Sequence, residues 1–285
     1  MGLARYMVLS GLRNRNMWFW GFGWMLMWIV FGAFIFNAEF TEIPQQFWED
    51  AVRYYTAFWS AFIITNTSAA TLVGLLNTLV HQAGGVVYLQ KYGRLTPGRL
   101  VASYYAGMLI PSLIFSLVLI ALTTALFYVG FRHHGIYVDL SAVLPKDPIW
   151  GTAAVVGLAL LAFVFAQSLV FLMGVAALSV SPRHVLRISY LPLMLVFASY
   201  LAYVFLPMPS WAFFVNPFLT LIGTIGAAYG GLDRLPSNLA GQPNGIMTMG
   251  DAVSIIIVWT AALTALAIPM TLRIRYSHVE ELREL

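Results

Sequence analysis

The chain has 285 residues, of which 9% are charged and 60% are hydrophobic, and it contains no cysteine. Soluble domains carry about 25% charged residues, so this composition excludes an ordinary soluble domain, and the lack of cysteine excludes disulfides and thiolate metal sites. The sequence pI of about 9.4 does not indicate a nucleic-acid binder, because no polar segment is long enough to fold a basic, aromatic-rich face. We expect one membrane domain over residues 1–285.

Six apolar stretches without Lys, Arg, Asp or Glu follow one another along the chain. A helix needs about 20 residues to cross the roughly 30 Å of hydrocarbon in a bilayer, so each stretch is predicted to be a transmembrane helix. The first stretch is also too long for a cleavable signal peptide. The predicted spans are Met17–Phe36, Tyr54–Val80, Val101–Val129, Ile149–Leu178, Ile188–Leu206 and Ala252–Leu272.

The basic residues gather on one side of this predicted arrangement. Segments 1–16, 81–100, 179–187 and 273–285 hold 11 of the 15 Lys and Arg residues. Because positive charge is retained in the cytoplasm during insertion, both ends are predicted to be cytoplasmic. The 11 residues are Arg5, Arg13, Arg15, Lys91, Arg94, Arg99, Arg183, Arg187, Arg273, Arg275 and Arg283.

Capping side chains directly before prolines predict where several helices begin. Thr96-Pro97, Ser181-Pro182 and Asn216-Pro217 each join a favoured N-cap to a proline at the first helical position. Asp251 is a candidate cap for the last helix. Gly84-Gly85 is expected to end the second helix.

Residues 207–251 are predicted to be a re-entrant outer region. Trp211 to Gly231 is long enough by count to cross, but Asn216-Pro217 breaks it and leaves a helix of about 18 Å. A seventh crossing would also move the C-terminal arginines to the outer side, against the charge bias. We expect Ser210–Val215 and Pro217–Tyr229 to be two short helices that dip in from the outer face.

Two sets of polar residues allow two interpretations each. Thr65, Asn66 and Ser68 in the second stretch can line a substrate path or form hydrogen bonds between helices. Tyr200 and Tyr203 in the fifth stretch can contact an apolar substrate or act as packing anchors.

The outer loop offers an incomplete set of metal ligands. His133, His134 and Asp139 supply two ring nitrogens from adjacent residues and one carboxylate. We expect no metal site there.

The absence of charged residues from the six stretches argues against two classes of membrane protein. Proton-coupled carriers keep ionisable groups inside the membrane, and a membrane-embedded hydrolase needs paired carboxylates or a Ser/His/Asp set. The six stretches contain neither. The chain also lacks a phosphate-binding G-x-x-x-x-G-K-[ST] loop, so energy for uphill transport would come from another polypeptide.

Four motifs lie in a fixed order around these stretches. A basic segment from Arg5 to Arg15 precedes the aromatic first stretch, and residues 84–100 read GGVVYLQKYGRLTPGRL. Ser181-Pro182-Arg183 forms a short link between stretches four and five, and Pro207-Met-Pro-Ser-Trp211 precedes Asn216-Pro217. This order resembles the type-2 permease subunit of ATP-binding-cassette exporters.

The resemblance implies a cytoplasmic interfacial helix over 1–16 and a coupling segment over 81–100 that docks on an ATPase. The alternative is a basic loop retained in the cytoplasm by the insertion rules. The resemblance marks Trp211, Asn216 and Pro217 as part of the re-entrant region. The implied coupling residues are Gly85, Val87, Leu89, Lys91, Arg94, Pro97 and Arg99.

The resemblance also implies partners: a second permease copy or paralogue, a separate ATPase that holds ATP and Mg, and the lipid bilayer of a prokaryotic cell membrane. The chain itself would be no enzyme and hold no cofactor. The charge-free, aromatic-rich interior favours a hydrophobic or amphiphilic substrate such as a drug or lipid. The alternatives are an ATP-independent carrier or channel, a membrane-embedded enzyme, or a non-transporting anchor subunit.

Overall fold

The computed structural model describes residues 3–93, 95–180, 188–238 and 245–273, without the side chains of residues 3, 4, 72, 74, 75 and 77–84. The predictions for Arg94, the Ser181-Pro182-Arg183 link, Arg187, Arg275 and Arg283 lie outside the described residues.

The chain is helical almost throughout. The first part contains α1 (Leu3–Arg13), α2 (Arg15–Trp18), the π-helical turn η1 (Phe19–Gly23), α3 (Trp24–Phe34), the 3₁₀ turns η2 (Ala38–Glu42) and η3 (Gln45–Phe47), α4 (Trp48–Tyr92) and α5 (Pro97–His133). The second part contains η4 (Leu140–Val143), α6 (Trp150–Val180), α8 (Leu191–Phe205), α9 (Ser210–Val215), α10 (Pro217–Gly230), β1 (Arg234–Leu235), β2 (Met247–Thr248), α11 (Met249–Met270) and η5 (Thr271–Arg273). β1 and β2 form one short antiparallel pair.

Four helical segments of the described chain are long and apolar enough to cross a membrane: Arg15–Glu42, Pro97–His133, Trp150–Val180 and Met249–Arg273. They expose large apolar side chains, as on α5, where Ile110 is 52% exposed, and such a surface suits lipid rather than water. The prediction of an all-α membrane protein is therefore confirmed.

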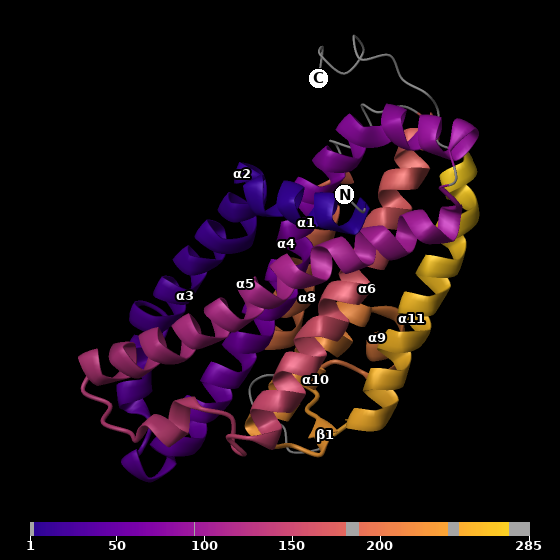
Figure 1. Ribbon diagram of the computed structural model, residues 1–285. Coiled ribbons are helices and arrows are strands. Elements are labelled where there is room, and N and C mark those ends of the chain that lie inside the picture. Colours follow the sequence, from indigo (N-terminus) through magenta and orange to yellow (C-terminus); the bar gives the residue numbers. More distant parts are fainter. Residues whose placement is uncertain (1–2, 94, 181–187, 239–244, 274–285) are drawn as a thin grey trace.

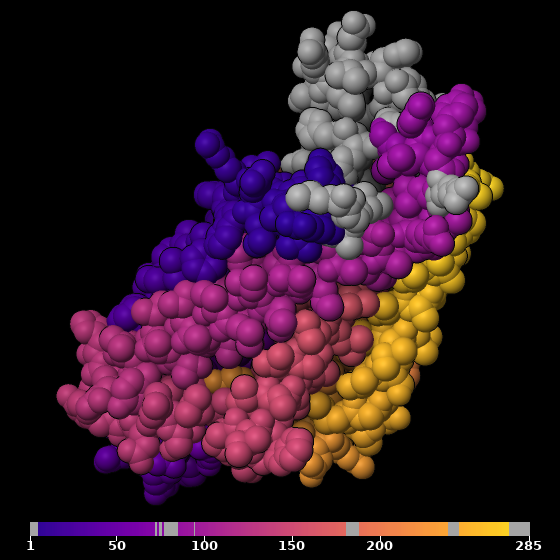
Figure 2. Space-filling view, viewed as in Figure 1, coloured from indigo at the N-terminus to yellow at the C-terminus, as the bar shows by residue number. Residues whose placement is uncertain are grey.

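The long helices run obliquely between two ends of the molecule (Figure 1). One end gathers α1, the C-terminal part of α4, the start of α5 and the end of α11, and the other end gathers η2, η3, η4 and the β1–β2 pair. α1 lies on the surface of α5 (Figure 2). Met7 of α1 is buried with Tyr104 and Met108 of α5, so the predicted N-terminal helix is present and packs on the bundle.

α10 is the central helix of the bundle. It contacts α4, α6, α8, α9 and α11, and every one of its residues except Ala228 is buried. With 14 residues it is about 21 Å long. The backbone N–H of Met208 donates a 2.8 Å hydrogen bond to the carbonyl of Ser237, so the chain before α9 and the chain after α10 lie side by side.

Two of the predicted caps are confirmed. The Thr96 hydroxyl accepts from the Arg99 N–H at the start of α5, and the Asn216 carboxamide accepts from the N–H groups of Phe218 and Leu219 at the start of α10. The Asp251 prediction is wrong, because α11 begins at Met249 with Thr248 as its N-cap. Asp251 instead accepts a 2.6 Å hydrogen bond from the Thr248 hydroxyl.

The expected helix end at Gly84-Gly85 is also wrong. α4 continues through both glycines to Tyr92 and has 45 residues. Glycine costs about 1 kcal/mol in a helix relative to alanine, and burial of an apolar side chain contributes more than that. Val86 is 6% exposed and packs in a cluster with Leu100 and Val101 of α5, so tertiary packing keeps this part of the chain helical.

Candidate functional site: an aromatic cavity and an exposed helix tip

A cavity of about 1190 Å³ lies between α3, η2, α4, α8 and the segment that follows α10. Ligand pockets usually have volumes of about 300–1,000 Å³, so the cavity can hold a molecule with several rings. Half of its lining is aromatic: Trp28, Phe36, Phe40, Tyr54, Tyr55, Phe58, Trp59, Phe62, Phe197, Tyr200 and Phe205. The other lining residues are Glu39, Ile43, Ala51, Leu201, Val204, Leu232, Asp233, Arg234, Pro236, Asn238 and Gly245.

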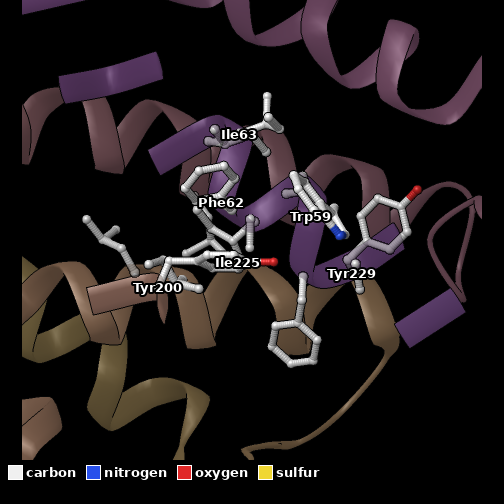
Figure 3. Close-up of a cluster of buried hydrophobic side chains, with 14 of the residues drawn as sticks. Trp59, Phe62, Ile63, Tyr200, Ile225 and Tyr229 are labelled. Atoms are coloured by element: carbon white, nitrogen blue, oxygen red, sulfur yellow. The ribbon is translucent and has the colours of Figure 1, made fainter. Parts of the chain in front are cut away.

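Helical spacing places these rings on two facing helices. On α4, Tyr55, Trp59 and Phe62 are separated by four and three residues and share one face. On α8, Phe197 and Tyr200 are separated by three residues and also share a face. The rings of Phe62 and Tyr200 lie next to each other (Figure 3), with their centroids 4.3 Å apart. The Trp59 and Tyr200 centroids lie 6.1 Å apart.

Trp28 of α3 completes this wall with its ring. Its ring lies 5.3 Å from Phe197 and 6.1 Å from Phe62, measured between centroids. Its indole N–H is buried and has no hydrogen-bond partner among the residues that the structure describes. A buried donor without a partner is costly, but this nitrogen is closed off from the cavity, so it is the ring of Trp28 that lines the wall.

Three charged residues line the cavity at the end where the chain leaves the helices. Glu39 lies in η2, and Asp233 and Arg234 follow α10. All three are exposed. Within the described part of the chain none of them forms an ion pair, and the pair between Asp50 and Arg53, at 3.7 Å, lies outside the lining. The cavity is therefore apolar between the helices and charged at its mouth.

The predicted path residues separate into three groups. Tyr200 lines the cavity. Tyr203 is fully buried, lies outside the lining and donates a 2.7 Å hydrogen bond to the carbonyl of Pro236. Thr65, Asn66 and Ser68 are fully buried in α4 and do not line the cavity. Their role in a substrate path stays a prediction.

Two buried carboxamides stand out in the middle of the bundle. Asn66 of α4 and Gln167 of α6 are both fully buried. Neither side-chain oxygen nor nitrogen has a hydrogen-bond partner among the described residues. Sequence reasoning missed Gln167, although a glutamine inside the otherwise apolar fourth stretch was a visible signal.

The predicted coupling residues form the end of α4 and the start of α5. Gly85, Leu89, Lys91 and Arg99 are exposed, whereas Val87 and Pro97 are partly buried. The link between the two helices covers only residues 93–96.

Two tyrosines at this helix tip were not predicted. Tyr88 is 62% exposed and Tyr92 is 68% exposed. Their rings lie 5.2 Å apart, and the Lys91 ammonium lies 5.4 Å from the Tyr92 centroid. We call Tyr88, Leu89, Lys91 and Tyr92 the α4 tip.

The predicted re-entrant residues lie where α9 meets α10. Trp211 is 66% exposed. Asn216 caps α10 and also donates a 2.8 Å hydrogen bond to the Ser199 hydroxyl of α8, while Pro217 is the first residue of α10 and is buried. The indole N–H of Trp259 in α11 donates to the carbonyl of Phe214 at 3.0 Å. Polar contacts therefore join the α9–α10 junction to both neighbouring helices.

His134, which directly follows α5, makes a structural contact. His134 Nε2 lies 3.1 Å from the carbonyl oxygen of Phe34. In the described ranges, no three or more His, Asp or Glu side chains gather as a metal site would require.

Sequence reasoning found one of the cavity's aromatic residues, Tyr200. The signal it missed was the aromatic stripe at helical spacing on α4 from Tyr55 to Phe62. No protein-family model matches this chain, and a comparison with curated proteins finds no match.

Proposed function

We propose that this protein is the transmembrane permease subunit of an ATP-binding-cassette exporter. It would pair with a second permease copy or a paralogue and with separate ATPase subunits that bind ATP and Mg. The α4 tip carries this proposal. Tyr88 and Tyr92 are exposed, tyrosine is a residue type that protein interfaces favour, and both residues lie beyond the predicted second span.

The short link between α4 and α5 suits the transmission of force. A partner that moves the α4 tip would move α4 and α5 together, because only residues 93–96 separate the two helices. Val86, next to the tip, belongs to the same buried cluster as Leu100 and Val101 of α5, so side-chain packing joins the two helices. Rigid helices can transmit such a displacement into the bundle.

The proposed topology has six crossings with both ends of the chain in the cytoplasm. It adds α4 and α8 to the four long apolar segments, with α9 and α10 as the re-entrant hairpin. α8 has 15 residues and a length of about 22 Å, so it would need flanking residues to complete its crossing. The hairpin is supported by the hydrogen bond from Met208 to Ser237 and by the burial of α10, because irregular backbone at membrane depth needs protein around it.

The aromatic cavity is the proposed substrate site. It lies at the end opposite the α4 tip, and its wall suits a hydrophobic or amphiphilic molecule. Such a molecule would leave on the non-cytoplasmic side. An ATP-independent carrier or a membrane-embedded enzyme would work without a partner at the α4 tip. A requirement for the α4 tip therefore distinguishes the exporter from these two alternatives.

The test is purification from native membranes in mild detergent, followed by mass spectrometry of proteins that co-purify in stoichiometric amount. We expect an ATPase with a phosphate-binding loop to co-purify with the unaltered protein and to be lost from the Tyr88→Ser, Tyr92→Ser double variant. Tyr137→Ser is the matched control, because Tyr137 is 70% exposed at the opposite end. Isolation of the unaltered protein without an ATPase, or retention of the ATPase by the double variant, would refute the proposal.

A further inference from the structure

We propose that the aromatic cavity binds an amphiphilic organic cation, a molecule with several flat apolar groups and one positive charge. The inference rests on the proposed function in one respect, since it names the substrate class of the same cavity. Two features of the cavity support it: the ring lining and the charges at the mouth.

The ring lining selects for apolar groups and tolerates a positive charge. Aromatic faces carry negative quadrupole charge, so they attract cations and repel anions. Trp28, Trp59 and Tyr200 lie on three different helices and surround the same space. A flat ligand would therefore meet rings from α3, α4 and α8 at once.

The mouth carries more negative than positive charge. The exposed carboxylates of Glu39 and Asp233 face one guanidinium, that of Arg234. The aliphatic part of Arg234 packs closely against Gly245. A Cβ added to Gly245 would lie only 2.2 Å from Arg234 Cβ. Two carboxylates against one guanidinium favour a ligand with a positive charge at this position.

The separation of apolar and charged lining sets the orientation of the ligand. Between the helices the wall contains rings and aliphatic side chains, and the three charged residues lie at the mouth. A charge buried between the rings without a partner would be costly. The apolar body of the ligand would therefore lie between α4 and α8, with its cationic group near Glu39 and Asp233.

The test uses two probes with the same aromatic body and an end group of opposite charge, (2-naphthylmethyl)trimethylammonium and 2-naphthylmethanesulfonate. Binding is measured by equilibrium dialysis on the purified full-length protein in nanodiscs of zwitterionic lipid, with empty nanodiscs subtracted. We expect saturable binding of the cation at least about tenfold tighter than that of the anion, which corresponds to the effect of one favourable charge interaction in a partly shielded site.

Matched variants locate the binding site. Glu39→Gln with Asp233→Asn removes both mouth carboxylates and should weaken cation binding by about tenfold. Glu42→Gln with Glu49→Gln removes two exposed carboxylates from the same end that do not line the cavity, so affinity should change by less than about twofold. Trp28→Phe keeps a ring but removes the indole N–H, and it should leave the preference for the cation unchanged.

Three results would overturn the inference: no saturable binding of the cation, equal or tighter binding of the anion, or equal weakening by both carboxylate pairs. The assay contains no ATPase, so its outcome is independent of the purification experiment. Cation binding without an associated ATPase would refute the exporter proposal and leave the cation site intact. An ATPase that depends on the α4 tip, without cation binding, would do the reverse.

Discussion

The backbone N–H of Met208 and the carbonyl of Ser237 meet at 2.8 Å, although α9 and α10 separate the two residues along the chain. Next to this contact, Tyr203 donates its hydroxyl hydrogen to the carbonyl of Pro236 at 2.7 Å. The two bonds hold the segment after α10 against the end of α8. Leu232, Asp233 and Arg234 of the same segment line the cavity, so these bonds also shape its mouth.

The first prediction concerns topology. The chain has no cysteine, so single-cysteine variants give an unambiguous labelling readout. We expect Asp233→Cys and Tyr137→Cys to react with a membrane-impermeant maleimide in intact cells, and Tyr92→Cys to react only after permeabilisation. All three side chains are exposed. Labelling of Asp233→Cys only after permeabilisation, as for Tyr92→Cys, would instead indicate that α9 and α10 cross the membrane.

The second prediction concerns the contact between α3 and α5. A Cβ added to Gly130 would lie 1.8 Å from the carbonyl oxygen of Ala33, so the two backbones touch without room for a methyl group. Gly130→Ala should destabilise the protein by about 3 kcal/mol, at the upper end for overpacking. We expect a lower apparent melting midpoint by size-exclusion chromatography after heating, or loss of folded protein.

Gly157→Ala is the matched control for this prediction. A Cβ added to Gly157 of α6 meets nothing within 4 Å, and alanine favours a helix over glycine by about 1 kcal/mol. The melting midpoint of this variant should stay constant or rise. A parallel loss in both variants would mean that the α3–α5 contact has no special role.

The third prediction separates the two functions of Asn216. Its side-chain oxygen Oδ1 caps α10, and its side-chain N–H donates a 2.8 Å hydrogen bond to the Ser199 hydroxyl. Asn216→Ala should cost about 1–2 kcal/mol, because it removes the cap and the interhelical bond together. Asn216→Asp keeps the capping oxygen and should recover part of this loss. Equal thermal stability of the two variants would show that the cap contributes nothing.

The fourth prediction concerns the unpartnered carboxamide of Gln167. A buried polar group without a partner costs about 1–3 kcal/mol, so Gln167→Met, which has a similar volume, should raise the melting midpoint. Leu172, a partly buried apolar residue of the same helix, provides the control substitution Leu172→Met, for which little change is expected. A decrease on Gln167→Met would mean that the carboxamide is hydrogen-bonded in the folded protein.

Local patterns in the sequence predicted the helices well where interactions between neighbouring residues determine the backbone conformation. α5 extends the predicted Val101–Val129 to Pro97–His133, and its start follows the Thr96-Pro97 signal. The short helix Ser210–Val215 was predicted residue by residue. Such features depend on side chains that bond to the backbone next to them and on runs of apolar residues.

The same reasoning failed at Gly84-Gly85, where packing against α5 outweighs glycine's low helix propensity. It also selected the polar residues of α4 as candidates for the substrate path. The periodicity of a sequence indicates that a residue faces inward, but it does not indicate which residues or cavity it contacts. Asn66 faces the protein interior and Tyr200 faces the cavity, and nothing in the local sequence distinguishes the two environments.

The sequence by itself determined that this is a helical membrane protein, and it predicted where several of its helices begin. Composition and capping are properties of neighbouring residues, so they need no tertiary contact. Only the tertiary structure decided that α10 lies at the centre of the bundle and that Trp28, Phe62 and Tyr200 surround one space. Those relations join segments far apart in the chain, and they depend on how whole helices pack rather than on any local pattern.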